Sequence, residues 1–268
     1  MASLVEPEGV EHSVVERDGV TLSYDTVGSG DPAIVLVHGW SCDRSYFAPQ
    51  RDHFASRHKV VALDLRGHGV SSRPDPGPGV YEIETFADDV LAVAAAAGLD
   101  RPVVVGHSLG GVIALACAAR TGAVRAAVMV DPAPIVNPAI KAFIGQAADA
   151  IATDDDTSWR RAFVQGMFLP SDTVRRDEII SGMAELPTAV AAASLRAIAT
   201  FDGAAAFAAV GVPLLTIGAA SPTDTSTDLR AACPTLTIGQ TVGAGHFNQL
   251  EVPEQVNLMI ERFLAVNR

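Results

Sequence analysis

Long hydrophobic runs are missing from this sequence of 268 residues. No apolar stretch approaches the roughly 20 residues that a membrane-spanning helix needs, so we expect none. Residues 1–10 hold acidic side chains and neither a basic nor an apolar block, which argues against a secretory signal. Basic side chains are also scarce: 19 lysines and arginines face 31 acids. The resulting net charge of −12 argues against nucleic acids and anionic membranes as partners.

Cysteine is equally rare. Cys42, Cys117 and Cys233 lie far apart, and no two are spaced as C-x-x-C. This pattern argues against a disulfide framework and a cysteine zinc site, and it predicts reduced thiols in a cytoplasmic protein. The run Asp154–Asp156 has no further ligand spaced nearby, so we interpret it as a loop and helix start and expect no metal site.

The apolar residues, 49% of the chain, are numerous enough for one large core. Short β-branched runs alternate with alanine-rich helical stretches, which predicts an α/β fold with a mostly parallel sheet covered on both faces. The expected strands are residues 12–17, 20–27, 33–37, 60–63, 103–105, 126–130, 214–217 and 236–238. The expected helices are residues 45–56, 84–97, 109–119 and 253–266. Asp18-Gly19 is a strong turn pair between the first two strands.

The alternation stops between about Pro134 and Phe207, where the pattern is helical throughout. Trp159, Phe163 and Met167, together with Phe168, are spaced there as on a helix. Such a stripe either packs on the core or overhangs a pocket, and we take Trp159, Phe163 and Met167 as tentative pocket residues.

Gly106-His107-Ser108-Leu109-Gly110 matches the pattern G-x-S-x-G. An apolar strand precedes it and a good helix follows it, which is the context of a nucleophile presented on a sharp strand-to-helix turn. The flanking glycines admit the crowding of such a turn, and the helix N-terminus favours an oxyanion. We therefore predict Ser108 to be a nucleophile. His107 lies inside the turn and has a tentative place in the pocket.

The turn His38-Gly39-Trp40 follows another expected strand. The backbone N–H of Trp40, with that of Leu109, would form an oxyanion hole. Asp64 to Gly69 holds Asp, Arg and His side chains, but we interpret it as a structural turn whose aspartate binds loop amides.

His246 lies in the small-residue loop Gly243-Ala244-Gly245-His246-Phe247, before the last helix. Its imidazole is the best candidate for the general base. A carboxylate should orient that imidazole. Asp131 ends one strand and Asp224 lies six residues past Gly218, and both satisfy the chain order Ser, Asp, His.

Together, His38-Gly39-Trp40, Asp64 to Gly69, Gly106 to Gly111, Val130-Asp131-Pro132 and Gly243 to Phe247 resemble the motifs of the α/β-hydrolase superfamily, in family order. The resemblance implies an eight-stranded mostly parallel sheet flanked by helices, a helical cap inserted after strand six, and no cofactor. It implies a core of residues 1–133 and 207–268 with a cap of residues 134–206. It also implies Ser108 as nucleophile, His246 as base, and Trp40 and Leu109 as amide donors.

One position departs from the family. Most members carry the acid shortly after strand seven in a Gly-x-x-Asp pattern, whereas Ser221 stands there in this sequence. Some members place the acid after strand six, where Asp131 lies. A strand end is also held more rigidly than the loop around Asp224, so we favour Asp131 and keep Asp224 as the alternative.

These residues predict a serine hydrolase that cleaves a small-molecule ester or lactone through an acyl-enzyme. The alternatives on the same scaffold are a C–C bond hydrolase and a cofactor-free haloperoxidase. A small-molecule-binding protein with a vestigial triad is a further alternative from another class. The natural substrate and the oligomeric state stay open.

Overall fold

The computed structural model describes residues 9–267. The expectation that no signal segment begins the chain therefore falls mostly outside the described residues, at residues 1–8. A single eight-stranded sheet forms the centre of the molecule, in the order β1-β2-β4-β3-β5-β6-β7-β8. The strands β1 and β2 pair antiparallel, as do β2 and β4, and all other pairs are parallel. This is the α/β fold class predicted from the sequence.

The strands are short and their bounds agree with the apolar runs of the sequence. They are β1 (Glu11–Arg17), β2 (Val20–Val27), β3 (Ile34–Val37), β4 (Val60–Leu63), β5 (Val103–His107), β6 (Ala126–Val130), β7 (Leu214–Gly218) and β8 (Thr237–Gln240). Asp18 and Gly19, both with positive φ, turn the hairpin between β1 and β2. The last strand begins one residue later than expected and ends at Gln240, and Leu236 packs in the core just before it.

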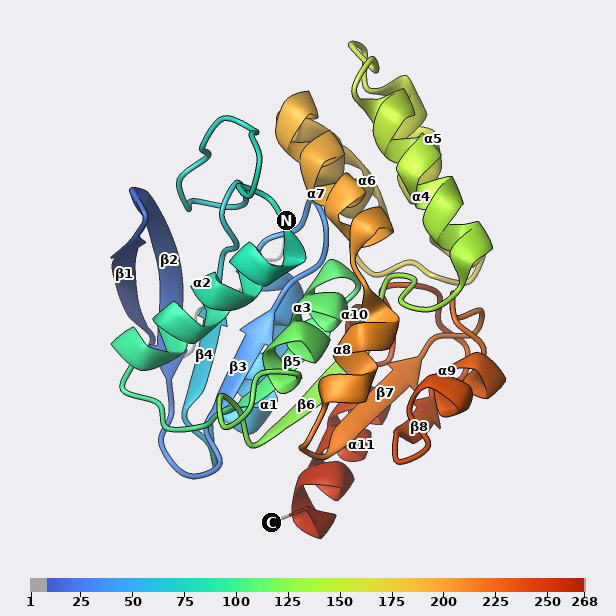
Figure 1. Cartoon of the computed structure of the whole chain (residues 1–268). Coiled ribbons are helices and arrows are strands. Elements are labelled where there is room, and N and C mark those ends of the chain that lie inside the picture. Colours follow the sequence, from blue (N-terminus) through green and yellow to red (C-terminus); the bar gives the residue numbers. More distant parts are fainter. Residues whose placement is uncertain (1–8, 268) are drawn as a thin grey trace.

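Helices cover both faces of the sheet (Figure 1). The near face in that view carries α2 (Ile83–Ala96), α3 (Leu109–Ala118) and α8 (Gly203–Ala209), and the far face carries α1 (Ala48–Phe54) and α11 (Pro253–Val266). Alternate strand residues point to the two faces: Val35 and Val37 join one core, Ile34 and Leu36 the other. Burial of both strand faces explains the continuous apolar runs of the sequence.

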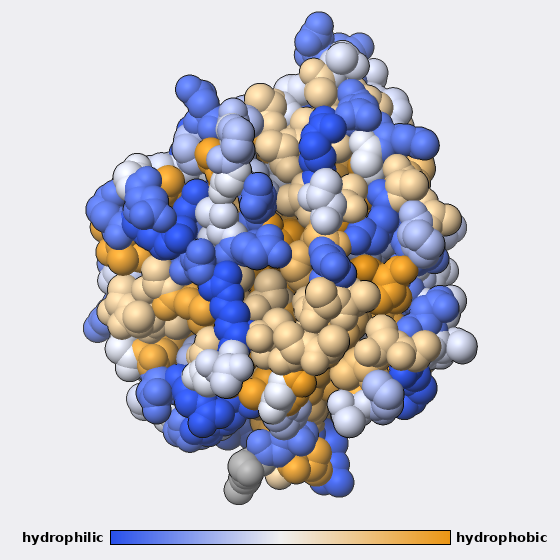
Figure 2. Space-filling model, viewed as in Figure 1, coloured by the Kyte–Doolittle hydropathy of each residue, from blue (hydrophilic) through white to orange (hydrophobic). Residues whose placement is uncertain are grey.

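Five helices lie between β6 and β7; the last is α8, and we call the first four the insert. They are α4 (Pro138–Ile151), α5 (Ser158–Gln165), α6 (Arg176–Glu185) and α7 (Thr188–Thr200). They stand together beyond one end of the parallel strands (Figure 1). The expected boundary between residues 206 and 207 falls inside α8. In Figure 2 the tip of the α4–α5 loop is hydrophilic, and an apolar area lies over α8, where Ala204, Ala205, Ala208 and Ala209 are exposed.

Some local expectations were wrong. The single helix expected over residues 45–56 begins as a short 3-10 helix, η1 (Arg44–Phe47), and continues as α1 with Pro49 in its first turn. Proline fits the first turn of a helix but not its interior, so the break occurs there. Met167 and Phe168 lie beyond the end of α5 at Gln165, and so do not extend the helical stripe of Trp159 and Phe163.

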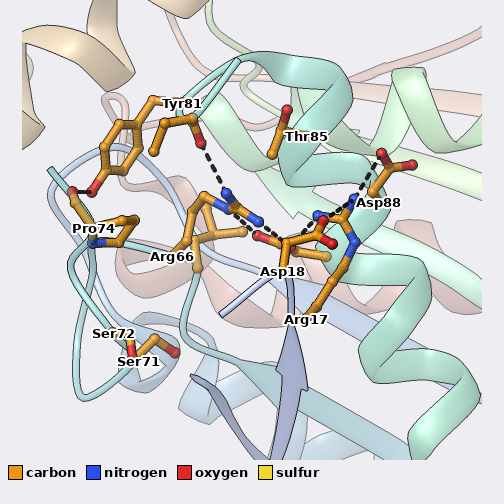
Figure 3. A network of polar contacts seen from close by, with 12 residues as sticks. Arg17, Asp18, Arg66, Ser71, Ser72, Pro74, Tyr81, Thr85 and Asp88 are labelled. Carbon is orange, nitrogen blue, oxygen red and sulfur yellow. Dashed lines mark hydrogen bonds and ion pairs between the residues drawn. The ribbon is translucent and has the colours of Figure 1, made fainter. Parts of the chain in front are cut away.

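A buried ionic network anchors the segment after β4. Arg66 binds the fully buried Asp89 of α2 through two nitrogens, at 2.5 and 2.7 Å, and Arg17 of β1 binds the same carboxylate at 2.9 Å. Figure 3 shows Arg17 and Arg66 side by side next to α2. The two oxygens of Asp64 accept backbone N–H groups of Arg44 and Val70. These contacts agree with a structural role for the turn after β4.

Among residues 9–267, no single helix is long and apolar enough to cross a membrane. Only α7 and α8 taken together reach that length and composition, across a bend of 62°.

Candidate active site

Ser108 stands at the sharp turn between β5 and α3. Its backbone has φ 53° and ψ −117°, a conformation that residues other than glycine rarely adopt. A side chain at Gly106 would overlap the carbonyl oxygen of Gly110, and one at Gly110 would overlap that of Val37. Only glycine therefore fits at positions 106 and 110, two residues before and two residues after Ser108. Strain of this kind gathers at functional sites, because the surrounding structure must enforce it.

His246 and Asp131 meet beside this turn. The Nδ1 atom of His246 lies 2.7 Å from Oδ2 of Asp131, and the other oxygen of Asp131 accepts the N–H of Ala219 at 2.8 Å. A carboxylate only accepts, so Nδ1 carries the proton and Nε2 is left as the basic nitrogen. Both side chains are largely buried, at 16% and 4% exposure. This is the arrangement in which an aspartate orients a histidine base.

Asp224, the alternative acid, is engaged elsewhere. Its carboxylate accepts the backbone N–H groups of Ile135, Val136 and Asn137, at 2.6 to 3.2 Å. These bonds hold the segment that leads from β6 into the insert. The structure thus brings Asp131, and not Asp224, to His246.

Ser108 and His246 line the same cavity. Within the described residues, no hydrogen bond joins the Ser108 hydroxyl to the His246 ring. In ligand-free sites such bonds are often long, and they tighten only when substrate is bound.

Two backbone amides are available near Ser108. Leu109 is the first residue of α3, where N–H groups have no acceptor within the helix. Trp40 lines the cavity after β3. Among the described residues, neither N–H donates to another protein group. The indole N–H of Trp40 is bound to the carbonyl of Ala191 in α7, at 2.8 Å, which fixes the side chain and leaves the backbone amide of Trp40 as the candidate oxyanion donor.

His107 lies beneath the site. Its Nε2 donates to the backbone carbonyl of His246 at 2.8 Å, and its Nδ1 is buried without a partner among the described atoms. Burial and the neighbouring His246 lower the pKa of His107 well below its usual value, so the ring is neutral. His107 therefore supports the loop of His246; it is not among the residues that line the main cavity beside Ser108, but it borders a small hollow together with Ser108 and His246.

The cavity measures about 570 Å³ and lies between the insert and the ends of the parallel strands. It is lined mostly by apolar side chains from the insert. Phe163 and Met167 line it as expected, whereas Trp159 does not and stacks on Phe163 with ring centres 5.2 Å apart. The lining residues include Trp40, Ser108, Asp131, Ile140, Phe143, Ile144, Phe163, Gly166, Met167, Phe168, Leu169, Leu195, Ile198, Ser221, Thr223, Gly245 and His246.

Sequence reasoning missed the contributions of α4 and α7 to this wall. Ile140 and Ile144 are spaced four apart, and Leu195 and Ile198 three apart, so each pair shares one helix face. That spacing was the available signal, but it does not distinguish a cavity wall from core packing. Ser221, at the position of the usual family acid, lines the cavity, as Asp131 does.

Comparison with known proteins adds independent information. A sequence model of the alpha/beta hydrolase family matches residues 34–257. The 2-(acetamidomethylene)succinate hydrolase of Mesorhizobium japonicum is 28% identical over 165 residues, 60% of this chain and 58% of that protein. The pimeloyl-[acyl-carrier protein] methyl ester esterase of Xanthomonas campestris is 38% identical over 110 residues, 41% of this chain and 40% of that protein. The match with this chain thus covers less than two thirds of the length of each of these two relatives.

Among solved structures, an enol-lactonase from Burkholderia xenovorans superposes with a TM-score of 0.82 at 23% identity, covering 94% of this chain and 100% of that one. At this identity the likeness establishes the fold alone.

Proposed function

We propose that this chain, which belongs to the alpha/beta hydrolase family, is a serine hydrolase that cleaves a small-molecule ester or lactone. The observation that carries the proposal is the hydrogen bond between His246 and Asp131 beside the Ser108 turn. That bond leaves Nε2 free to act as a base in the cavity that the serine lines. Hydrolase activity agrees with the family and with relatives named as esterase and lactonase.

In the proposed mechanism, Nε2 of His246 takes the proton of the Ser108 hydroxyl while the serine oxygen attacks the carbonyl carbon of the ester. The carbonyl oxygen becomes an oxyanion between the amides of Trp40 and Leu109. The bond to the alcohol oxygen then breaks, and His246 returns the proton to that oxygen. In the second half of the reaction, His246 deprotonates a water that attacks the acyl carbon, the bond to the Ser108 oxygen breaks, and His246 returns the proton to that oxygen as the acid leaves.

Replacing the nucleophile tests this mechanism. Ser108→Ala should reduce kcat for p-nitrophenyl butyrate by about 10⁴- to 10⁶-fold. An alkyl fluorophosphonate should add to Ser108 of the wild type, seen by mass spectrometry, and not to the variant. Ser56→Ala, which changes an exposed serine at the end of α1, is the control and should behave as wild type. Ordinary esterase activity in Ser108→Ala would exclude the mechanism, and an unlabelled wild type that still binds esters tightly would favour a binding protein.

The cavity wall supports an uncharged, apolar acyl group as the preferred substrate portion. Aliphatic and aromatic side chains from α4, α5 and α7 form the wall, and the ionisable groups that line it are Asp131 and His246. Within the described lining no lysine or arginine is present to pair with an anionic substrate. A carboxylate there would be buried without a partner and would face Asp131. In this respect we propose a substrate unlike the dicarboxylate named for the Mesorhizobium relative.

Two esters of matched length separate these possibilities. The ratio kcat/KM should be at least about 100-fold higher for ethyl hexanoate than for monoethyl adipate, because an unpaired buried charge costs several kcal/mol. Equal values for the two esters would contradict the proposed acyl preference and leave the serine mechanism intact.

The cellular compartment is a smaller part of the proposal. Cys42, Cys117 and Cys233 are all free and buried. Three unpaired thiols support a reducing, cytoplasmic environment.

A further inference from the structure

One loop of the insert contacts both the cavity and the base. It runs from Gly166 to Asp172, between α5 and α6, and its first four residues line the cavity. The carbonyl of Met167 accepts the backbone N–H of His246 at 3.1 Å. The carboxylate of Asp172 accepts the N–H of Gly245 at 3.0 Å. The loop that walls the substrate therefore also holds the segment that carries the imidazole.

Asp172 joins these two segments through one oxygen atom. Its Oδ2 also accepts the N–H of Leu169 at 2.7 Å, so it fixes the turn of its own loop and the loop of His246 together. The residue is 1% exposed. Among the described ion pairs none includes Asp172, and its carboxylate accepts hydrogen bonds from the backbone amides of Leu169 and Gly245. Removal of this acceptor would leave the buried N–H of Gly245 unpaired, which destabilises that geometry.

Gly245 fits this contact because it has no side chain. A Cβ atom there would stand 2.5 Å from Oδ2 of Asp172 and 2.8 Å from the carbonyl oxygen of Met167. The two loops approach too closely for any other residue. The small residues before His246 thus allow the insert to reach the base, in addition to freeing the imidazole to reach the serine.

His246 is consequently fixed on three sides. Its N–H is bound by Met167, its carbonyl accepts Nε2 of His107 at 2.8 Å, and its ring is bound by Asp131 at 2.7 Å. The last two partners belong to the core, and only the first belongs to the insert. Asp172 stabilises the contact between Met167 and His246 by binding the N–H of Gly245, the residue next to His246.

We propose that Asp172 is a positioning residue for His246, through which the insert fixes the base as well as shaping the cavity. The inference rests on the proposed function, because it assigns Asp172 to the placement of that base. Asp172 touches neither substrate nor nucleophile. Its contribution is therefore to the rate of the chemical steps, with little effect on substrate binding.

The test uses a matched pair of buried aspartates. Asp154, also in the insert and 7% exposed, accepts the backbone N–H groups of Trp159 and Arg160 and lies outside the His246 loop. For p-nitrophenyl butyrate, Asp172→Ala should lower kcat by about 10- to 100-fold with KM within about threefold, as expected for a displacement of about 1 Å. Asp154→Ala should keep kcat within about threefold of the wild-type value, even if it lowers the melting temperature as much as Asp172→Ala does.

Two further variants keep the test decisive. Asp172→Asn retains an oxygen that can accept both N–H groups, so it should recover most of the lost kcat. Gly245→Ala disrupts the same contact by placing a Cβ atom against Asp172, and it should lower kcat as Asp172→Ala does. If Asp172→Ala does not fold, Gly245→Ala serves as the test in its place. An unchanged kcat in both Asp172→Ala and Gly245→Ala, or an equal loss in Asp154→Ala, would overturn the proposal.

Proton NMR separates this inference from the proposed function. The His246 Nδ1 proton, bonded to Asp131, should exchange faster with water in Asp172→Ala than in the wild type and in Asp154→Ala. This signal is measurable in a protein that turns over no ester. Absent esterase activity with a changed signal would therefore reject the serine hydrolase and keep the positioning role. An unchanged signal would reject the positioning role.

Discussion

At the scale of single residues, Asp131 and Asp224 were both candidates for the acid from the sequence, but they have different surroundings in the structure. Asp131 has φ 35° and binds the His246 ring, while Asp224 binds three consecutive backbone amides. The positive φ of Asp131, like that of Ser108, marks a backbone held in an unusual conformation at the site. One carboxylate faces a titratable ring and the other faces fixed donors, so their replacement has different consequences.

Asp131→Asn should lower kcat for p-nitrophenyl butyrate by about 10⁴-fold, because an amide in that position favours the wrong histidine tautomer. Asp224→Asn should keep kcat within about tenfold and lower the free energy of unfolding by about 1–3 kcal/mol, since amide bonds to a charged acceptor are weakened. Ester hydrolysis and urea denaturation of both variants measure this. Comparable losses of kcat in the two variants would mean that another carboxylate serves His246.

At the scale of elements, the β5–turn–α3 unit leaves no room beside its glycines. Gly106→Ala should lower the free energy of unfolding by about 3 kcal/mol or more, since its Cβ would collide with the backbone of Gly110. Gly182→Ala is the control: Gly182 lies within α6, where a Cβ meets nothing within 4 Å. That change should raise the free energy of unfolding by about 0.5–1 kcal/mol. Urea denaturation is the measurement, and equal shifts would contradict the close packing of the turn.

Elements that are dictated locally could be predicted from sequence. The apolar runs 60–63 and 126–130 coincide with β4 and β6, and Pro253 opens α11. Gly106 and Gly110 located the Ser108 turn because the pattern G-x-S-x-G between an apolar run and a helical stretch can be recognised within the local sequence. The contact of Asp172 with the His246 loop could not be predicted from sequence, because its partner Gly245 is 73 residues away and comes close only after folding. The cavity wall was missed in part for the same reason, since apolar helix faces look alike until they are packed.

At the scale of the whole molecule, buried histidines make the stability depend on pH. His38 and His68 are buried beside each other, with ring centres 5.3 Å apart. Burial lowers the pKa of His68 from 6.5 to about 3, and that of His38 from 6.5 to about 4. Both rings are neutral in the folded protein, whereas the unfolded chain takes up protons near pH 6.5. The unfolded state thus binds more protons between pH 6.5 and 4.

The free energy of unfolding should therefore fall as the pH drops below 6.5, by about 1.4 kcal/mol per pH unit for each of these histidines down to its folded pKa. Urea denaturation from pH 7.5 to 4.5 measures the slope. His68→Gln keeps a donor for the Arg66 carbonyl that Nδ1 of His68 contacts and should reduce the slope by the share of one histidine. A slope identical to that of the wild type would contradict the neutral, buried state of His68.

The chain segments that flank the insert lie against each other, and this has an evolutionary consequence. Gly203, where α8 begins, packs on Ile135, and Lys141 binds the carbonyl of Phe201. We therefore expect that a gene segment between these points can be exchanged by recombination without separating β6 from β7. The contact of Asp172 with Gly245 limits that freedom. Chimaeras that inherit residues 166–172 and 243–247 from different parents should fold well and turn over slowly until the two loops have adapted to each other.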